Sequence, residues 1–99
     1  MRTTIKLKGK EFAVYETKRG YYDFELAGHS IMDVAKGKMT AIMAFAYYAI
    51  KACCKRENVN FPYTSIENFV DDDEIDMDEL TRIFTDVNKR EEKAVEGEA

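Results

Sequence analysis

The sequence predicts a single α+β domain in which an N-terminal β-hairpin packs on a small bundle of four to five helices, with predominantly helical content. Residues 3–16 alternate between apolar and polar side chains with a period of two, as in a half-buried hairpin. Residues 18–87 repeat apolar side chains at helical spacing, with capping residues between the repeats. The 99 residues are 45% apolar, which is enough for one modest core.

We expect the hairpin to turn at Gly9 and Lys10, because a two-residue Gly-X loop suits a type II′ turn. The strands would then pair in a register with three facing pairs, namely Lys8–Glu11, Leu7–Phe12 and Ile5–Val14. This register puts the four apolar residues on one face and an opposite-charge pair on the other. Two strands are only marginally stable alone, so the apolar face must pack on helices.

The first helix is expected over residues 18–27. Thr17 can cap its N-terminus. Tyr22 and Leu26, four residues apart, mark its inner face, with Tyr21 and Phe24 flanking them. Gly20 should weaken the first turn by about 1 kcal/mol relative to alanine.

The longest helix is expected over residues 38–56, after a short helical turn between a Ser30 cap and Gly37. Two of its three faces are apolar, which indicates burial among several neighbours. The third face is expected to be exposed and carries Thr40, Ala44, Tyr47, Lys51 and Lys55. The stretch is too short and too polar to span a bilayer, which needs about 20 apolar residues.

Two further helices begin at capping signals. Thr64–Glu67 matches a capping box before a short helix whose inner residues are Ile66, Phe69 and Val70. Asp76 precedes the second helix, whose inner residues are Leu80, Ile83, Phe84 and Val87. We therefore expect one domain over residues 1–90 and a disordered acidic tail over 91–99.

The net charge of −4 hides an uneven distribution. Residues 1–66 carry 11 basic and 6 acidic side chains, whereas residues 67–99 carry 4 basic and 13 acidic ones. A chain with this acidic balance is a poor general binder of nucleic acid. Its acidic second part suits a basic partner, or serves only to keep the protein soluble.

The residues that could carry enzyme chemistry do not form a catalytic or metal-binding set. The single histidine, His29, is expected in an exposed loop, with no cluster of metal ligands around it. Cys53 and Cys54 are adjacent and lack the C-x-x-C spacing. Cys53 should be buried, and Cys54 should be partly exposed. The acidic run 71–79 lacks the glycine and ligand spacing of a calcium loop. We therefore expect no enzyme, no catalytic residue, no cofactor and no bound metal.

The order of the elements resembles that of the tail assembly chaperones of long-tailed bacteriophages and prophages. The resembling stretches are the hairpin 5–12, the helix 17–28, the Ala-rich helix 39–54 and the acidic segments 66–73 and 77–80. The resemblance implies a non-catalytic assembly factor that binds the long helical tape measure protein before the tail tube polymerises around it. It also implies residence in the cytoplasm of the host bacterium.

The partner expected from this resemblance is the tape measure protein. The tail tube protein and a second copy of the chain are further candidates, while no nucleic acid and no membrane is expected. A helical client would need an apolar, adaptable surface. The residues expected to form it are Tyr47, Phe61 and Tyr63, together with the acidic residues Asp71, Asp72 and Asp73.

Two alternatives remain open at this stage. A generic prophage adaptor domain could use the same apolar surface on one folded partner at fixed stoichiometry. A nucleic-acid-binding regulator could use the basic residues of the hairpin, Arg2, Lys6, Lys8 and Lys10, although the acidic second part argues against it.

Overall fold

The computed structural model describes residues 3–85 and confirms the predicted class, a two-stranded hairpin packed on five helices. The labelled elements are β1 (Thr3–Leu7), β2 (Lys10–Val14), α1 (Lys18–Leu26), α2 (Ile31–Ala35), α3 (Met39–Arg56) and α4 (Ile66–Val70). A fifth helix begins at Met77, and its described part reaches residue 85. Val87 and the tail expected over 91–99 lie outside the described residues.

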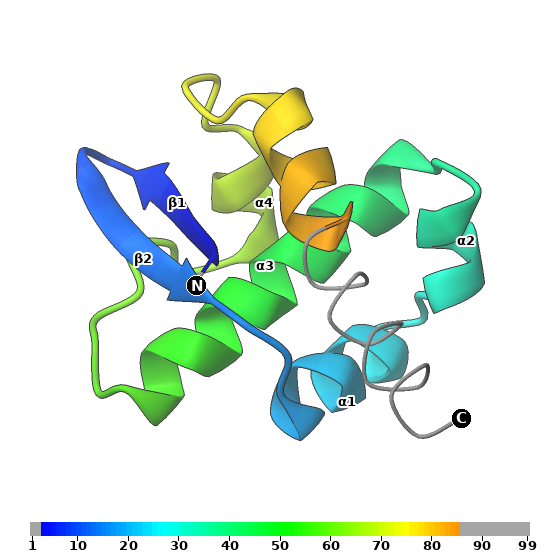
Figure 1. The fold of residues 1–99 in the computed structure, drawn as a ribbon, viewed down its shortest axis with the longest axis horizontal. Helices are drawn as coiled ribbons and strands as arrows, with labels where there is room; N and C mark the ends of the chain where they lie inside the picture. Colours follow the sequence, from blue (N-terminus) through cyan, green and yellow to red (C-terminus); the bar gives the residue numbers. More distant parts are fainter. Residues whose placement is uncertain (1–2, 86–99) are drawn as a thin grey trace.

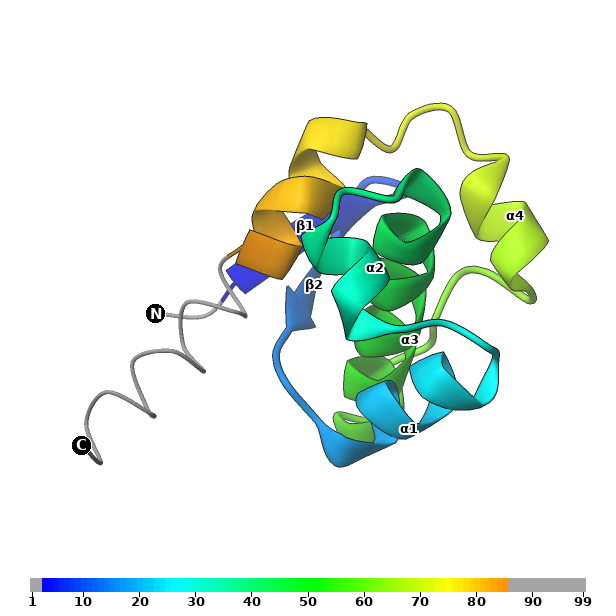
Figure 2. The ribbon, with the colours of Figure 1, turned by 90° about the vertical axis from the view of Figure 1, so that its right-hand side faces the viewer.

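Helix α3 lies at the centre of the molecule and contacts α1, α2, α4 and β2 (Figure 1). The hairpin and the helix 77–85 lie on one side of α3, and α4 lies on the opposite side (Figure 2). Eleven of its 18 residues are buried. Ala44 and Tyr47 are among them, so the expectation that the third face is exposed was wrong there. The reason is that neighbours from distant parts of the chain surround the middle of α3, while Thr40, Lys51 and Lys55 remain exposed.

The hairpin forms as predicted, but its register differs by two residues. Ile5 faces Phe12 and Lys6 faces Glu11, because the turn is made by Lys8 and Gly9. Both turn residues have positive φ, 51° and 80°, as a type I′ turn requires. Side chains alternate with a period of two, so a two-residue shift leaves the same apolar residues on the inner face. That face is buried as expected, and it consists of Ile5, Leu7, Phe12 and Val14.

Helix α1 begins as predicted but turns a different face inward. The Thr17 hydroxyl accepts a hydrogen bond from the Gly20 N–H at 2.9 Å and caps the helix. Gly20 and Phe24 are the buried residues, whereas Tyr22 and Leu26 are exposed. A Cβ at Gly20 would lie 3.5 Å from the Ala49 Cα, an ordinary contact distance, so α1 packs directly on α3 at this point. The prediction for Tyr22 and Leu26 was wrong because α1 has apolar residues on two faces and packs only one of them on α3.

The remaining caps agree with the sequence signals, with one shift. Ser30 caps α2, and Asp76 accepts a hydrogen bond from the Asp78 N–H at 3.0 Å at the start of the helix 77–85. The cap of α4 is Ser65, one residue later than the predicted box, because its hydroxyl accepts from the Asn68 N–H at 3.2 Å. In α4 Phe69 is buried, but Val70 is exposed, contrary to expectation. Because α4 has only five residues, it buries little more than one side chain against α3.

Candidate functional site

The aromatic residues predicted to contact a partner are largely part of the core. The rings of Tyr47, Phe61, Tyr63 and Phe69 pack edge to face, with centroids 5.3–5.6 Å apart. Tyr47 and Tyr63 are buried and Phe61 is half-buried. Tyr47 and Tyr63 are therefore not exposed as expected, while their expected contact with a partner stays a prediction. Their rings are covered because α4 and the preceding connection fold back over α3.

The edge of this aromatic cluster holds the hairpin turn against the acidic loop. The Tyr63 hydroxyl donates a hydrogen bond to Asp72 Oδ2 at 2.5 Å, and Lys8 Nζ lies 3.7 Å from the same oxygen. The Glu74 N–H donates to Asp72 Oδ1 at 3.1 Å. The Lys8 ammonium also lies 5.3 Å from the centre of the Tyr63 ring. We call Lys8, Tyr63 and Asp72 the turn latch.

The contacts of the turn latch shift the pKa values of Tyr63 and Asp72. The hydrogen bond from Tyr63 holds the pKa of the Asp72 carboxyl below its usual value, and the Glu74 N–H and Lys8 act in the same direction. Burial, followed by the hydrogen bond to Asp72, raises the pKa of the Tyr63 hydroxyl well above its usual range. Tyr63 is therefore a neutral donor and Asp72 a charged acceptor at neutral pH.

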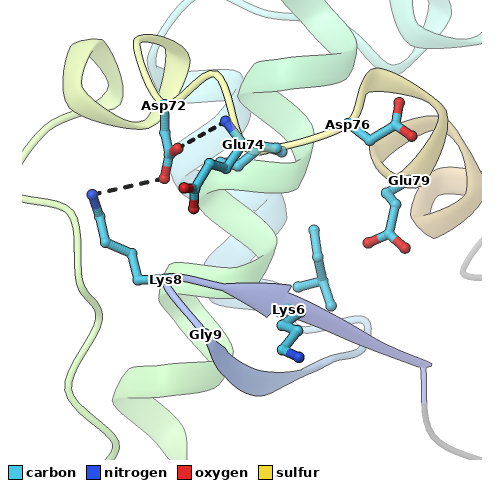
Figure 3. Close-up of a pocket in the computed structure, with 9 residues that line it drawn as sticks. Lys6, Lys8, Gly9, Asp72, Glu74, Asp76 and Glu79 are labelled. Atoms are coloured by element: carbon cyan, nitrogen blue, oxygen red, sulfur yellow. Dashed lines mark hydrogen bonds and ion pairs between the residues drawn. The ribbon is translucent and has the colours of Figure 1, made fainter.

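Two surface hollows lie on either side of the turn latch. The first has a volume of about 450 Å³ and contains four of the predicted partner residues, Tyr63, Asp71, Asp72 and Asp73, beside Lys8. The second, of about 410 Å³, lies between the hairpin and the loop that carries Glu74 and Asp76. Figure 3 shows Lys8 reaching toward Asp72 across this second hollow, whereas Lys6 extends away from the carboxylates of Asp76 and Glu79. The structure thus brings the acidic residues together with Tyr63 but not with exposed aromatic rings.

The largest exposed apolar side chains of the first half of the chain belong to a different region. They are Tyr22 at 58%, Leu26 at 71%, Met32 at 64% and Met39 at 52% exposure. We refer to these four exposed side chains of α1, α2 and the first turn of α3 together as the helical apolar surface. This exposure was not expected from the sequence for Tyr22 and Leu26, which were predicted to lie on the inner face of the first helix. The sequence does indicate an alternative inner face of α1, because Gly20 and Phe24 are also four positions apart.

The reactive side chains singled out from the sequence are used in packing. Half-buried His29 stacks on Phe24, with ring centroids 5.4 Å apart, so it is less exposed than expected. The Cys53 thiol donates to the Tyr15 C=O and accepts from the Tyr15 N–H, both at 3.3 Å. Cys54 is buried, not partly exposed as expected, because the C-terminal part of α3 packs below the hairpin. Burial raises the pKa of its thiol to about 11, which keeps it protonated and poorly nucleophilic at neutral pH.

Within residues 3–85, no group of three or more His, Cys, Asp or Glu side chains is placed to hold a metal ion. In the same part of the chain, no helix has the length and apolarity needed to cross a membrane. No known protein family, curated protein or solved structure matches this chain.

Proposed function

We propose that this protein is a non-catalytic tail assembly chaperone that binds amphipathic helices of a tape measure protein and keeps them soluble in the bacterial cytoplasm. The observation that carries the proposal is the helical apolar surface, formed by Tyr22, Leu26, Met32 and Met39. Four large apolar side chains from one stretch of 18 residues, each more than half exposed, are unusual for a chain with an otherwise closed core.

The composition of this surface suits a helical client of variable sequence. Tyr22 and Leu26 are four positions apart and lie one above the other on α1, as a ridge that can pack beside a helix. Met32 and Met39 add unbranched, flexible side chains, which adapt to differently shaped apolar partners. A ridge of this kind favours binding through regularly spaced apolar residues of another helix.

The charges near the ridge are compatible with a polar rim around an apolar centre. Arg19 donates to Asp23 Oδ2 at 3.0 Å, and its guanidinium lies 5.5 Å from the centre of the Tyr22 ring. This arrangement holds the ring at the surface instead of in the core. Weak binding at one such surface becomes strong when several copies line a long client that has repeated sites.

The proposal is tested with the product of the long, heptad-rich gene expected beside this one, co-expressed with the chain. Leu26→Asp should leave the client insoluble, because a carboxylate cannot pack in an apolar contact. Val70→Asp is the matched control, since it places the same charge on an exposed apolar residue of α4. The control should keep the client soluble, with several copies of the chain bound to each client.

Three outcomes would count against the proposal. One is a soluble client with Leu26→Asp, if circular dichroism shows that the variant is folded. Another is binding of one folded partner at a one-to-one ratio, which would favour the adaptor domain. The third is a neighbourhood of metabolic or regulatory genes that contains no long heptad-rich product.

A further inference from the structure

The two edges of the hairpin differ in what covers them. On the outer edge of β1, Arg82 Nη2 of the helix 77–85 donates a hydrogen bond to the Thr4 carbonyl oxygen at 3.0 Å. Figure 1 shows β1 between β2 and this helix, so β2 forms the outer side of the sheet. A long side chain therefore protects the edge of β1 from pairing with another strand.

The outer edge of β2 has backbone groups that are not used in the pairing with β1. Leu7 and Lys10 close a two-residue turn, so they form a hydrogen-bonded pair, and such pairs alternate along an antiparallel ladder. The N–H and C=O groups of Glu11 and Ala13 consequently point away from β1. Thr4 occupies the equivalent outward position on β1, in agreement with its bond from Arg82. Across residues 3–85, the sheet contains β1 and β2 and no third strand.

A small hollow lies beside this edge. It has a volume of about 60 Å³ and is lined by Ala13 and Glu11 of β2, by Val59, and by Glu57 and the two cysteines at the end of α3. The Val59 side chain is exposed at its rim. The hollow has room for a small apolar side chain such as that of Ala or Val.

We propose that the outer edge of β2 is a docking site for an extended segment of a partner chain, which adds as a third strand and places a small apolar side chain between Ala13 and Val59. Strand addition uses exposed backbone groups for affinity and a pocket for alternate side chains for specificity. The β2 edge offers both, whereas on the β1 edge the Thr4 carbonyl already accepts a hydrogen bond from Arg82 and the adjoining hollow is lined largely by carboxylates. This site is separate from the helical apolar surface and does not depend on the proposed function.

The charge of the hollow selects the chemistry of the segment. Its charged lining side chains are two carboxylates, Glu11 and Glu57, and Glu57 accepts a hydrogen bond from the Tyr15 hydroxyl. A segment with a basic residue next to the small apolar one complements this lining. Lys10 and Glu11 on the strand itself discourage pairing with purely apolar strands.

The probe is a synthetic peptide of about six residues, the usual length of a strand, in which Val and Lys alternate. Binding to the full chain is followed by two-dimensional NMR and by hydrogen exchange at the amides of Glu11 and Ala13. We expect saturable shifts at Glu11, Ala13 and Val59 and slower exchange at the first two. A peptide with N-methylated backbone at alternate residues, or with Glu in place of Lys, should not bind.

The matched variants are Ala13→Pro and Thr4→Pro, which each remove an outward N–H group, one from either edge of the sheet. Losing one hydrogen bond of about 1 kcal/mol should weaken peptide binding by Ala13→Pro about fivefold. Peptide binding by Thr4→Pro should be the same as by the unchanged chain. Val59→Arg provides a second variant that leaves the backbone intact, and its cation should repel the peptide and weaken binding.

The proposal is overturned if the Val–Lys peptide produces no saturable shifts, or if the shifts are confined to the acidic loop at residues 71–79. Equal binding by Val59→Arg and the unchanged chain would also overturn it. A concentration-dependent dimer that disappears in Val59→Arg would show that the occupant is a second copy of this chain, not a partner segment.

Discussion

Replacing Gly20 by alanine tests whether the close packing of α1 depends on its cap. In an ordinary helix interior, this change stabilises by about 1 kcal/mol, because alanine has the higher helix propensity. Here the new Cβ would lie 3.1 Å from Thr17 Oγ1, closer than ordinary contacts, and 3.5 Å from the Ala49 Cα, which is an ordinary distance. The only atom that must move is the capping oxygen. Displacing it weakens the bond to the Gly20 N–H, and such a cap contributes about 1 kcal/mol.

The gain in helix propensity and the loss of the cap should therefore cancel, so that Gly20→Ala leaves the free energy of unfolding almost unchanged. Thr17→Ala alone should cost about 1 kcal/mol by removing the cap. In the Thr17→Ala background the crowded oxygen is gone, and Gly20→Ala should then stabilise by about 1 kcal/mol. The expected coupling energy between the two sites is thus about 1 kcal/mol, within the usual range for contacting residues.

Urea denaturation followed by far-ultraviolet circular dichroism measures the four free energies of unfolding in this cycle. Glu25→Ala, at an exposed position of α1, is the control and should change stability by less than about 0.5 kcal/mol. The reasoning is refuted if Gly20→Ala stabilises equally with and without Thr17. That result would mean that the added methyl group does not disturb the Thr17 cap.

Three further predictions follow from the core and the turn latch. Phe24→Ala should cost about 3–5 kcal/mol in thermal or urea unfolding, because the buried ring packs edge to face on Phe45; a cost below about 1 kcal/mol would contradict this packing. Tyr63→Phe should destabilise at neutral pH, and the difference from the unchanged chain should shrink in acid. The pKa of Asp72 is lowered by folding, so its stabilisation is present above the unfolded value of about 3.9 and is lost as pH falls below it; a difference that persists unchanged at pH 2 would contradict the role of the carboxylate. Cys54 should react with Ellman's reagent at pH 8 far more slowly in the native chain than in urea, because burial raises the pKa of its thiol to about 11; equal rates would show that the thiol is accessible.

The sequence was most informative where a structural feature depends on residues close in the chain. Thr17, Ser30 and Asp76 cap their helices as predicted, because a cap involves only the backbone of the next few residues. The alternating pattern of the hairpin also identified its inner face correctly. It could not identify the register, because registers that differ by two residues bury the same side chains. The turn chemistry that decides between them is the positive φ of Lys8 and Gly9.

The sequence was least informative about which apolar residues are covered. Tyr47 was expected on an exposed face and is buried under Phe61 and Phe69, which arrive from later parts of the chain. Tyr22 and Leu26 were expected inside and are exposed, because α3 covers only the Gly20 and Phe24 face of α1. The candidate site moved accordingly. Four of the six predicted residues meet in one hollow, while the exposed apolar residues are elsewhere.

The sequence by itself determined the fold class, the order of the helices, most of their ends and the inner face of the hairpin. Each of these follows from hydrogen bonds and side-chain periodicity within a few residues of the chain. Only the tertiary structure decided the burial of Tyr47, the exposure of the helical apolar surface, the turn latch between Lys8 and Asp72 and the free edge of β2. These depend on which of several apolar faces meets a neighbour, and that choice is made by segments far apart in the sequence competing for the same central helix.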